Sequence, residues 1–143
     1  MDMEIKVLRQ TAVPSYKTAG AAGLDLAAAT DEAITLAPME RKMVPTGICV
    51  SIPTGYVGLV FARSGLSTKH GIALTNSVGV IDSDYRGEIM CSMINLGQEA
   101  YTIMPGDRIA QMVITPAPQA TIREVDELSQ TERGEGGFGS TGR

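Results

Sequence analysis

The residues with the clearest chemical potential run from Gly79 to Gly87, in the order Gly-Val-Ile-Asp-Ser-Asp-Tyr-Arg-Gly. Apolar residues precede and follow this segment, which is typical of two strands, 77–81 and 88–94, that form a hairpin with a wide loop. Asp82 can accept a proton, and the backbone and aromatic ring of such a hairpin can hold a flat ligand. The segment therefore is a candidate site for ligand binding and proton transfer.

Turn formation is the competing interpretation of the two aspartates. Asp82 and Asp84 lie between two apolar runs, and aspartate favours turns because its side chain bonds to nearby backbone groups. Taken alone, the segment favours turn-forming aspartates over catalytic ones. The rest of the chain changes that balance.

A second candidate site lies at a short helix expected over residues 63–71. Ser64 is a fair N-cap and Gly71 is placed to end the helix in the left-handed conformation. Helix amides attract an anion and a neighbouring arginine adds a charge-assisted contact, so Arg63–Gly65 is a candidate phosphate site. Any Ser-capped helix after an arginine shows this pattern. His70 falls in the last turn, where a cation suits the helix dipole, which favours a structural role.

The C-terminal segment, 129–143, contains a failed P-loop pattern. From Gly134 it runs G-x-x-x-x-G-S-T, but serine replaces the lysine and no helix follows. Glycine amides and two hydroxyls can still wrap phosphates, Arg133 supplies charge, and Phe138 can stack on a base. The alternative is a mobile tail without a role, since the apolar content collapses here.

Composition limits the classes of function. The chain has 143 residues, the usual size of one domain, and its 16 Gly and 7 Pro suit many short strands joined by turns. Its net charge is −4, and no basic stripe is visible. This argues against a nucleic-acid polymer as a partner, whereas local arginines and a metal ion permit a small polyanion.

Cysteine usage and the N-terminus indicate the compartment. Cys49 and Cys91 are the only cysteines and His70 is the only histidine, so a Cys/His zinc site is not expected. Two buried thiols in a reducing compartment are expected instead. The acidic N-terminus lacks the apolar core of a signal peptide, and no apolar run approaches the ~20 residues of a membrane helix. We expect a soluble, cytoplasmic protein without a membrane partner.

Short apolar runs bounded by glycine and proline indicate about ten strands in all. Alanine favours helix over residues 21–29, but the run is short and follows two glycines, so a strand is expected, with Asp25 on the opposite face from Leu24 and Leu26. Antiparallel strands with such turns predict a sandwich, jelly roll or barrel. The further strands expected are 3–8, 33–36, 41–51, 56–62, 100–104, 108–114 and 119–128.

At this point five segments, in order, resemble the five motifs of the homotrimeric deoxyuridine triphosphatases (dUTPases). The third and fifth are the most specific, and Ala62 departs from the proline that the family often has before Arg-Ser. The segments are 22–26, 62–66, 79–87, 105–111 and 133–141.

The resemblance implies a distorted, mostly antiparallel jelly roll over residues 1–128 and a mobile lid over 129–143, in a trimer whose sites lie between subunits. It implies hydrolysis of dUTP to dUMP and pyrophosphate with Mg²⁺, which limits uracil in DNA and supplies dUMP for dTMP synthesis. In this family's chemistry Asp82 is the base that activates a water for in-line attack on the α-phosphorus.

The resemblance also implies a role for each further site residue. The side chain of Asn76 and the backbone of Val80, Ile81 and Met90 read uracil, while Tyr85 packs on the deoxyribose. Mg²⁺ is held mainly by substrate phosphates, with Asp25 in the outer shell at most. The phosphate-binding residues are Arg63, Ser64, Gly65 and Gln111 from the body, with Arg133, Gly139, Ser140 and Thr141 from the tail, where Phe138 covers the base.

Two alternatives remain open from the sequence. A dCTP deaminase shares the fold, and a nucleotide-binding regulatory module would bind without turnover. The Asp-Tyr hairpin and the tail with Phe138 favour the diphosphatase, and the presence of Asp82 argues against a module without turnover.

Overall fold

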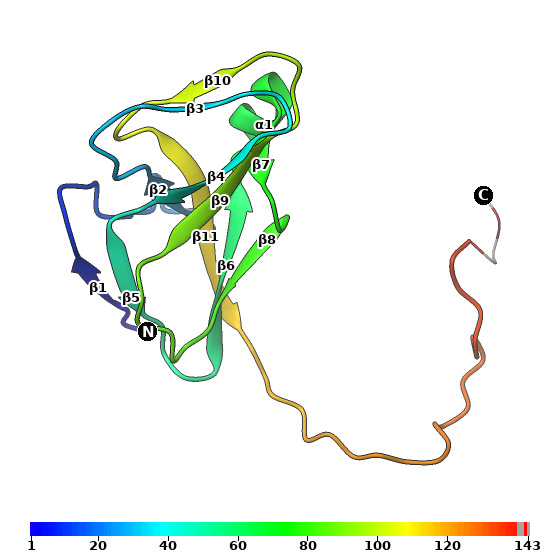
Figure 1. Ribbon diagram of the computed structural model, residues 1–143. Helices are drawn as coiled ribbons and strands as arrows, with labels where there is room; N and C mark the ends of the chain where they lie inside the picture. Colours follow the sequence, from blue (N-terminus) through cyan, green and yellow to red (C-terminus); the bar gives the residue numbers. More distant parts are fainter. Residues whose placement is uncertain (140–141, 143) are drawn as a thin grey trace.

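The computed structural model describes residues 1–139 and 142, and shows a β-rich body followed by an extended C-terminal segment (Figure 1). In this part of the chain no helix is long and apolar enough to cross a membrane. The described elements are β1 (Glu4–Val7), β2 (Leu24–Ala27), β3 (Ile34–Leu36), β4 (Arg41–Pro45), β5 (Ile48–Ser51), β6 (Tyr56–Ala62), α1 (Ser64–His70), β7 (Ile72–Leu74), β8 (Val78–Ile81), β9 (Met90–Asn95), β10 (Tyr101–Ile103) and β11 (Arg108–Pro116).

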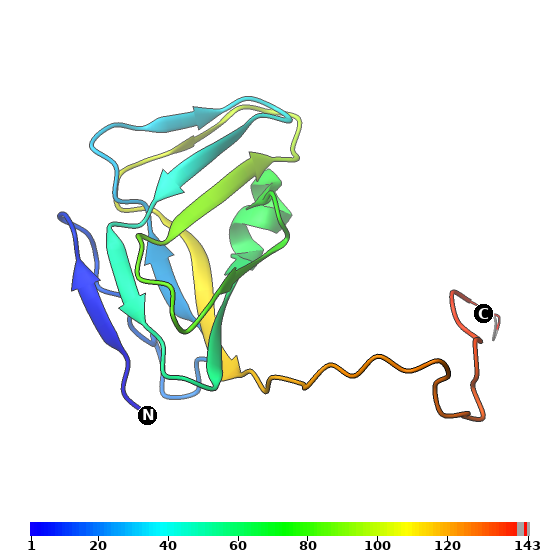
Figure 2. The same cartoon turned by 60° about the horizontal axis from the view of Figure 1, so that its bottom comes forward.

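All the strand pairs are antiparallel, which confirms the expected all-β jelly-roll class. The larger sheets have the strand orders β2-β11-β6-β8 and β4-β9-β7, and two-stranded pairs β1-β5 and β10-β3 complete the body. Figure 2 shows the body from a second side, with the chain leaving it after β11. The core is built where the apolar faces of these sheets meet.

Alternating burial explains why these segments form strands. In β6 the residues Gly58 and Val60 are buried, while Leu59 between them is only half-buried. The same period of two places Leu26 and Met112 in the core at 0% exposure. Burying each such side chain contributes about 1.5–3 kcal/mol, so the pattern fixes which face of each strand points inward.

We call the face of the β2-β11-β6-β8 sheet that points away from the core the outer face. Strand register places Leu59 between Val113 and Val80, and Gln111 between Asp25 and Phe61. Val80 is 60% exposed although it is apolar. By register and alternation the outer face comprises Asp25, Val57, Leu59, Phe61, Val78, Val80, Gln111 and Val113.

The predicted hairpin between 77–81 and 88–94 is wrong in its pairing. β8 pairs with β6, whereas β9 pairs with β4 and β7. The loop 82–89 therefore crosses from one sheet to the other. Gly58 of β6 lies opposite Ile81 of β8, where a Cβ added to Gly58 would meet the Ile81 side chain at 3.3 Å. A sequence pattern shows that a strand exists but does not show which strand lies beside it.

Two further expected strands differ from the structure. The run 41–51 divides into β4 and β5, because Gly47 adopts a φ of +70° that ends the extended conformation. Residues 119–128, all described, form no strand, and Ile122 is 88% exposed. An apolar pattern alone does not make a strand without a partner to pair with.

The helix differs from expectation at one end only. Arg63, not Ser64, is the N-cap, with an extended backbone and no side-chain cap bond, while Ser64 is the first helical residue. Gly71 ends the helix in the left-handed conformation as predicted, with a φ of +70°.

The two cysteines are free, but only Cys91 is fully buried, since Cys49 is half-buried.

Candidate active site

The first group of site residues, which we call the arginine cluster, comprises Asp25, Arg63, Arg108 and Gln111. Arg108 Nη1 donates to Asp25 Oδ2 at 3.0 Å, and Arg63 Nε lies 3.5 Å from Asp25 Oδ1. Arg63 Nη1 also donates to the Arg108 carbonyl at 3.1 Å. The residues come from β2, β11 and the N-cap of α1, so three of the five sequence segments meet here.

Local sequence explains how these groups approach one another. Gln111 lies opposite Asp25 in the β2–β11 ladder, and its Nε2 donates to the Ala62 carbonyl at 3.2 Å. Gly23 makes room for this side chain, because a Cβ there would lie 2.7 Å from Gln111 Oε1. A side chain at this position would therefore force the end of Gln111 to move.

The charge of the arginine cluster suits a polyanion. Two guanidinium groups face one carboxylate, so the cluster has an excess positive charge of one, although the whole chain is acidic. Ser64 and Gly65 are exposed beside it, and the first turn of α1 has no acidic residue. Planar guanidinium groups form strong, charge-assisted bonds to phosphate oxygens.

The second group surrounds the loop 82–89 and forms a small concave surface of about 160 Å³ that we call the hollow. This volume is below the ~300 Å³ typical of sites for whole drug-sized ligands and suits a single ring. Tyr85 donates its hydroxyl to the Glu88 carbonyl at 2.9 Å, which fixes its ring over Gly87. The hollow is lined by Val80, Ile81, Asp82, Tyr85, Glu88, Ile89 and Met90.

Asn76 belongs to the same region. It lies in the turn between β7 and β8, and a Cβ added to Gly79 would approach its amide nitrogen to 3.8 Å. The structure therefore places Asn76 beside Gly79 of β8. The hollow itself is lined by Val80 and Ile81 of β8 and by Met90 of β9, although β8 and β9 do not form a ladder.

The hollow and the arginine cluster lie at opposite ends of β6. Arg63 follows the last residue of β6, whereas Ile81 lies opposite Gly58 and Asp82 follows one position beyond. At about 3.3 Å per residue these positions are roughly 20 Å apart. Val80 and Asp82 also line a groove that includes Leu59 of the outer face. Asp25 and Gln111 of the arginine cluster lie on the same face by strand register. Within the described residues of one chain, the hollow and the arginine cluster therefore do not form one site.

The tail residues lie away from both groups. Arg133 and Gly139 are exposed and Phe138 is fully exposed, and the described segment leaves the body without folding back on it (Figures 1 and 2). Its described hydrogen bonds are local, such as Gly134 N to the Thr131 carbonyl at 3.1 Å. Ser140 and Thr141 lie outside the described residues.

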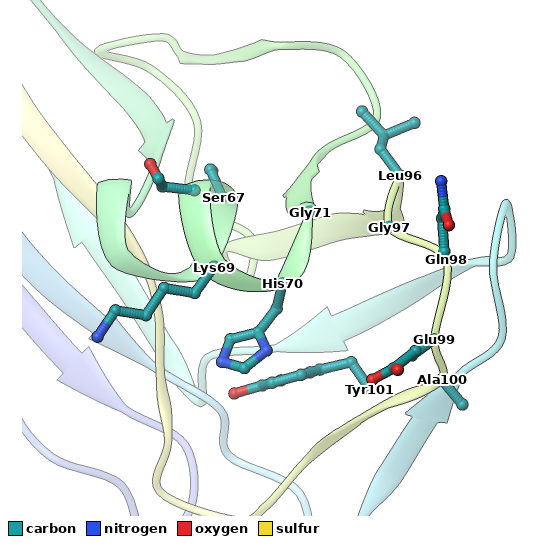
Figure 3. Close-up of a pocket in the computed structure, with 11 residues that line it drawn as sticks. Ser67, Lys69, His70, Gly71, Leu96, Gly97, Gln98, Glu99, Ala100 and Tyr101 are labelled. Carbon is teal, nitrogen blue, oxygen red and sulfur yellow. The ribbon is translucent and has the colours of Figure 1, made fainter.

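His70 lies in a different surface pocket, of about 470 Å³, between the end of α1 and residues 96–101. Its ring packs on Tyr101 with the centroids 4.8 Å apart and the planes at 44° (Figure 3). This contact accounts for His70 as a packing residue, as its sequence position suggested.

Sequence reasoning missed the role of Arg108. Arg108 lies in the segment 105–111, which resembles a family motif, but only the β2–β11 register places it beside Asp25.

From the sequence, metal ligation was assigned only indirectly, to Asp25 in the outer shell at most. Within the described residues no group of three or more His, Cys, Asp or Glu side chains is placed to hold a metal ion.

Known proteins are similar to this chain over most of its length. A family model described as dUTPase matches residues 9–142. A deoxyuridine 5′-triphosphate nucleotidohydrolase of Finegoldia magna is 50% identical over 142 residues, which cover 98% of this chain and 99% of that protein.

Two solved structures are similar over most of their length. A dUTPase of Staphylococcus bacteriophage 80alpha, solved with dUPNHPP, has a TM-score of 0.91 and 31% identity and covers 99% of both chains. A mutant dUTPase of the S. aureus phage phi11, described with a structural Mg(II) ion, has a TM-score of 0.81 and 27% identity and covers 89% of this chain and 98% of that one.

The fold and the two groups on the outer face define an all-β hydrolase of nucleoside triphosphates. More particularly, the chain belongs to the dUTPase family and is a dUTP diphosphatase, which releases dUMP and pyrophosphate.

Proposed function

We propose that each active site is assembled from neighbouring copies of the chain, with the hollow of one copy facing the arginine cluster of another. The observation that carries this proposal is the separation of roughly 20 Å along β6 between Asp82 and Arg63. Groups that act on consecutive phosphates of one nucleotide must lie much closer. Because both groups open on the same face of one sheet, a second copy seated there can supply the missing half.

The outer face itself supports a second copy as its occupant. Its central residues are apolar, including Leu59, Phe61 and Val80. An apolar surface of this kind, between the hollow and the arginine cluster, suits a subunit interface. A closed ring gives every copy the same two contacts. We propose a homotrimer, as the family resemblance implies.

In the mechanism we propose, Asp82 accepts a proton from a water molecule. The water oxygen then forms a bond to the α-phosphorus while the bond from this phosphorus to the bridging oxygen breaks, which releases dUMP and pyrophosphate. Asp82 is exposed where it can meet such a water. A base of this kind contributes about 10²–10⁴-fold to the rate.

The hollow would select uracil through fixed backbone groups. We assign this role to the backbone of Val80, Ile81 and Met90 and to the Asn76 side chain. Cytosine carries an amino group where uracil has an oxygen, so it would leave a buried polar mismatch, and sites of this type discriminate by about 10⁴-fold or more. The close walls of the hollow would exclude the thymine methyl group, and the Tyr85 ring would exclude a ribose 2′-hydroxyl.

The arginine cluster would hold the phosphates. Bonds to the Arg108 and Ala62 carbonyls hold the Arg63 and Gln111 side chains in the cluster, Ser64 and Gly65 lie beside it, and Arg108 adds charge. Asp25 keeps both arginines in place through its two oxygens. After cleavage, the two negative phosphate groups of the pyrophosphate product contact this positive cluster.

The residues fit a Mg²⁺ ion that is bound mainly through the substrate. Asp25 is the one carboxylate of the cluster and already pairs with two arginines, so it would contact waters of the ion rather than the ion itself. When bound, Mg²⁺ neutralises phosphate charge and orients the pyrophosphate leaving group.

We assign the segment 129–143 as a lid that closes over the site of another copy. Phe138 is fully exposed in the described chain, and burying its ring on the uracil would recover apolar contact. Arg133, Gly139, Ser140 and Thr141 would reach the phosphates. Closure excludes water and strengthens these charges. We place the enzyme in the cytoplasm, which two free cysteines support.

Mixed oligomers test the shared site. Asp82→Asn and Arg63→Met each disable a different half, so each variant alone is expected to be inactive with dUTP. In a random equal mixture of the two variants, about a quarter of all sites combine two intact halves, and pyrophosphate release should return to about that level. Mixed oligomers no more active than either parent would place the whole site in one chain.

A further inference from the structure

Glu88 fastens the closing end of the loop 82–89 to the body. Both oxygens of its carboxylate are bound by Arg9, through Nη1 and through Nη2, the latter at 3.0 Å. The backbone N–H of Gly47 donates to Glu88 Oε1 at 2.8 Å. The carboxylate therefore joins three segments that are distant in sequence: the N-terminal strand region, the β4–β5 turn and the loop.

The next residue along the chain is held still more firmly. Ile89 is 1% exposed, and its N–H donates to the Ile48 carbonyl at 2.9 Å. The Ile89 carbonyl accepts two bonds from Thr46, from the hydroxyl at 2.7 Å and from the N–H at 3.2 Å. The side of Glu88 that faces the core is thus fixed by backbone bonds that do not depend on the Arg9 pair.

The other side of Glu88 faces the hollow. Its carbonyl accepts the Tyr85 hydroxyl at 2.9 Å, and Tyr85 N donates to the Asp82 carbonyl at 3.1 Å. Glu88 is therefore the link between the fixed β4–β5 turn and the two residues assigned to sugar packing and proton transfer. A shift of Glu88 would move the Tyr85 ring first.

The Arg9 side of the contact is also well defined. Leu8 N donates to the Gly47 carbonyl at 2.8 Å, which places the chain before Arg9 against the same turn. Gly47 adopts a φ of +70°, and a Cβ there would lie 3.2 Å from Arg9 Cγ and 2.8 Å from Ala29 Cβ. The guanidinium hydrogen bond is also the main reason that the pKa of Glu88 lies below its usual range, so the pair stays ionised at neutral pH.

We propose that Arg9 and Glu88 are a positioning pair that sets the affinity for the nucleoside by holding the hollow in its binding shape. Both oxygens of the Glu88 carboxylate are turned to Arg9, so the pair acts through Tyr85 and not on the reacting atoms. The inference rests on the proposed placement of the nucleoside in the hollow.

The test compares Glu88→Gln with a matched control. Glu40 makes the same kind of contacts, accepting the Ala37 N–H at 2.8 Å and pairing with Lys42 at 3.2 Å, but it lies outside both groups of site residues. The equilibrium constant Kd is measured with the non-hydrolysable analogue α,β-imido-dUTP, and KM and kcat are measured with dUTP. Glu88→Gln should raise Kd and KM about five-fold and leave kcat within about two-fold. Glu40→Gln should change none of them.

Arg9→Met provides the second arm, because it breaks the same pair without changing the loop. It should raise Kd by a similar factor, and the double variant should be no weaker than either single one, since the two side chains act as a unit. An unchanged Kd in Glu88→Gln, or a double variant in which the two effects multiply, would overturn the proposal. A lower melting temperature with unchanged Kd would also overturn it, since it would leave only a structural role.

Failure of this inference is distinguishable from failure of the proposed site. Asp82→Asn reports on the site itself and does not depend on the Arg9 contact. If Asp82→Asn abolishes turnover while Glu88→Gln binds the analogue normally, only the positioning role is lost. If Asp82→Asn retains turnover, the placement of the site is wrong, whatever the Arg9 and Glu88 variants show.

Discussion

Asp25 accepts a hydrogen bond from Arg108 at 3.0 Å, and its second carboxylate oxygen lies 3.5 Å from Arg63 Nε. One short acidic side chain on β2 thus sets the orientation of two basic side chains from β11 and from the start of α1. The Asp25 side chain is 18% exposed, whereas that of Arg108 is 50% exposed. The acidic group is therefore the inner member of the cluster, and the basic groups keep donors free for a ligand.

Asp25→Asn should lower kcat/KM for dUTP about ten- to hundred-fold, as expected for a residue that orients ligands from the outer shell of a metal site. The amide keeps the size of the side chain but loses the charge that holds both arginines. The concentration of Mg²⁺ at half-maximal rate should rise in the same variant. Pyrophosphate release measured across a Mg²⁺ titration gives both values. An unaltered Mg²⁺ dependence would separate Asp25 from the metal.

Asp82→Asn should bind α,β-imido-dUTP as tightly as the wild type and lose about 10²–10⁴-fold in kcat. The amide has the shape of the carboxylate but does not accept the proton of the attacking water. Calorimetry measures the binding of the analogue, and pyrophosphate release from dUTP measures kcat. Asp84→Asn, on the same loop, is the control and should leave kcat in the wild-type range. Retained turnover in Asp82→Asn would exclude it as the base.

Much of the fold was predictable because burial alternates along its strands. Tyr56–Ala62 was expected as a strand and is β6 with the same bounds, and Gly71 ends the helix where its freedom at positive φ predicted. What could not be predicted was pairing. The apolar residues of β8 fit β6 or β9 equally well as a pattern, and only the packed structure shows that β8 pairs with β6.

The candidate site rests on motif resemblance more than on residue chemistry. Asp25, Arg63 and Gln111 lie far apart in the sequence and meet only through the β2–β11–β6 register. The contact between Arg9 and Glu88 spans 79 positions and has no local sequence pattern. Long-range charge pairs of this kind depend on the final packing, which a pattern of apolar residues does not specify.

Gly23→Ala should lower kcat/KM about ten-fold with little loss of stability. The new Cβ would lie 2.7 Å from Gln111 Oε1, and this flexible end of the side chain must turn away from its position in the arginine cluster. A misplacement of this size at a phosphate-binding group is costly for catalysis. Gly20→Ala is the control, because a Cβ there meets nothing within 4 Å. Equal kinetics of the two variants would show that Gln111 tolerates the shift.

The Arg9–Glu88 pair should make stability depend on pH in the acidic range. The pKa of Glu88 is lowered in the folded state, first by the Arg9 side chain and further by the Gly47 N–H, although burial opposes both. The stabilisation is therefore fully present above the unfolded-state pKa of 4.5 and is lost as the pH falls through the lower folded-state value. Glu88→Gln should melt about 2 °C below the wild type at pH 7.

The two melting curves should converge as the pH falls below the pKa of Glu88 in the folded protein, because the wild-type side chain is then uncharged as well. Scanning calorimetry at several pH values checks this, with Glu40→Gln measured in parallel. The pKa of Glu40 is also lowered, chiefly by the Ala37 N–H, but its carboxylate is solvent-exposed and a smaller difference is expected. A constant gap between wild type and Glu88→Gln at every pH would contradict the charge argument.

Removal of residues 132–143 should leave the melting temperature unchanged and lower kcat about 10²-fold or more. The described part of this segment makes only local hydrogen bonds and lies away from the body (Figure 1), so its loss removes no packing. Catalysis loses the groups that exclude water and contact the phosphates.

Phe138→Ala in the full-length chain separates the two contributions, because it keeps the phosphate-binding residues and removes only the ring. This variant should weaken binding of the analogue and retain a larger share of kcat than the truncated chain. A truncated enzyme with a normal kcat would show that the segment is not a lid, because chemistry would then proceed at full rate in an open site.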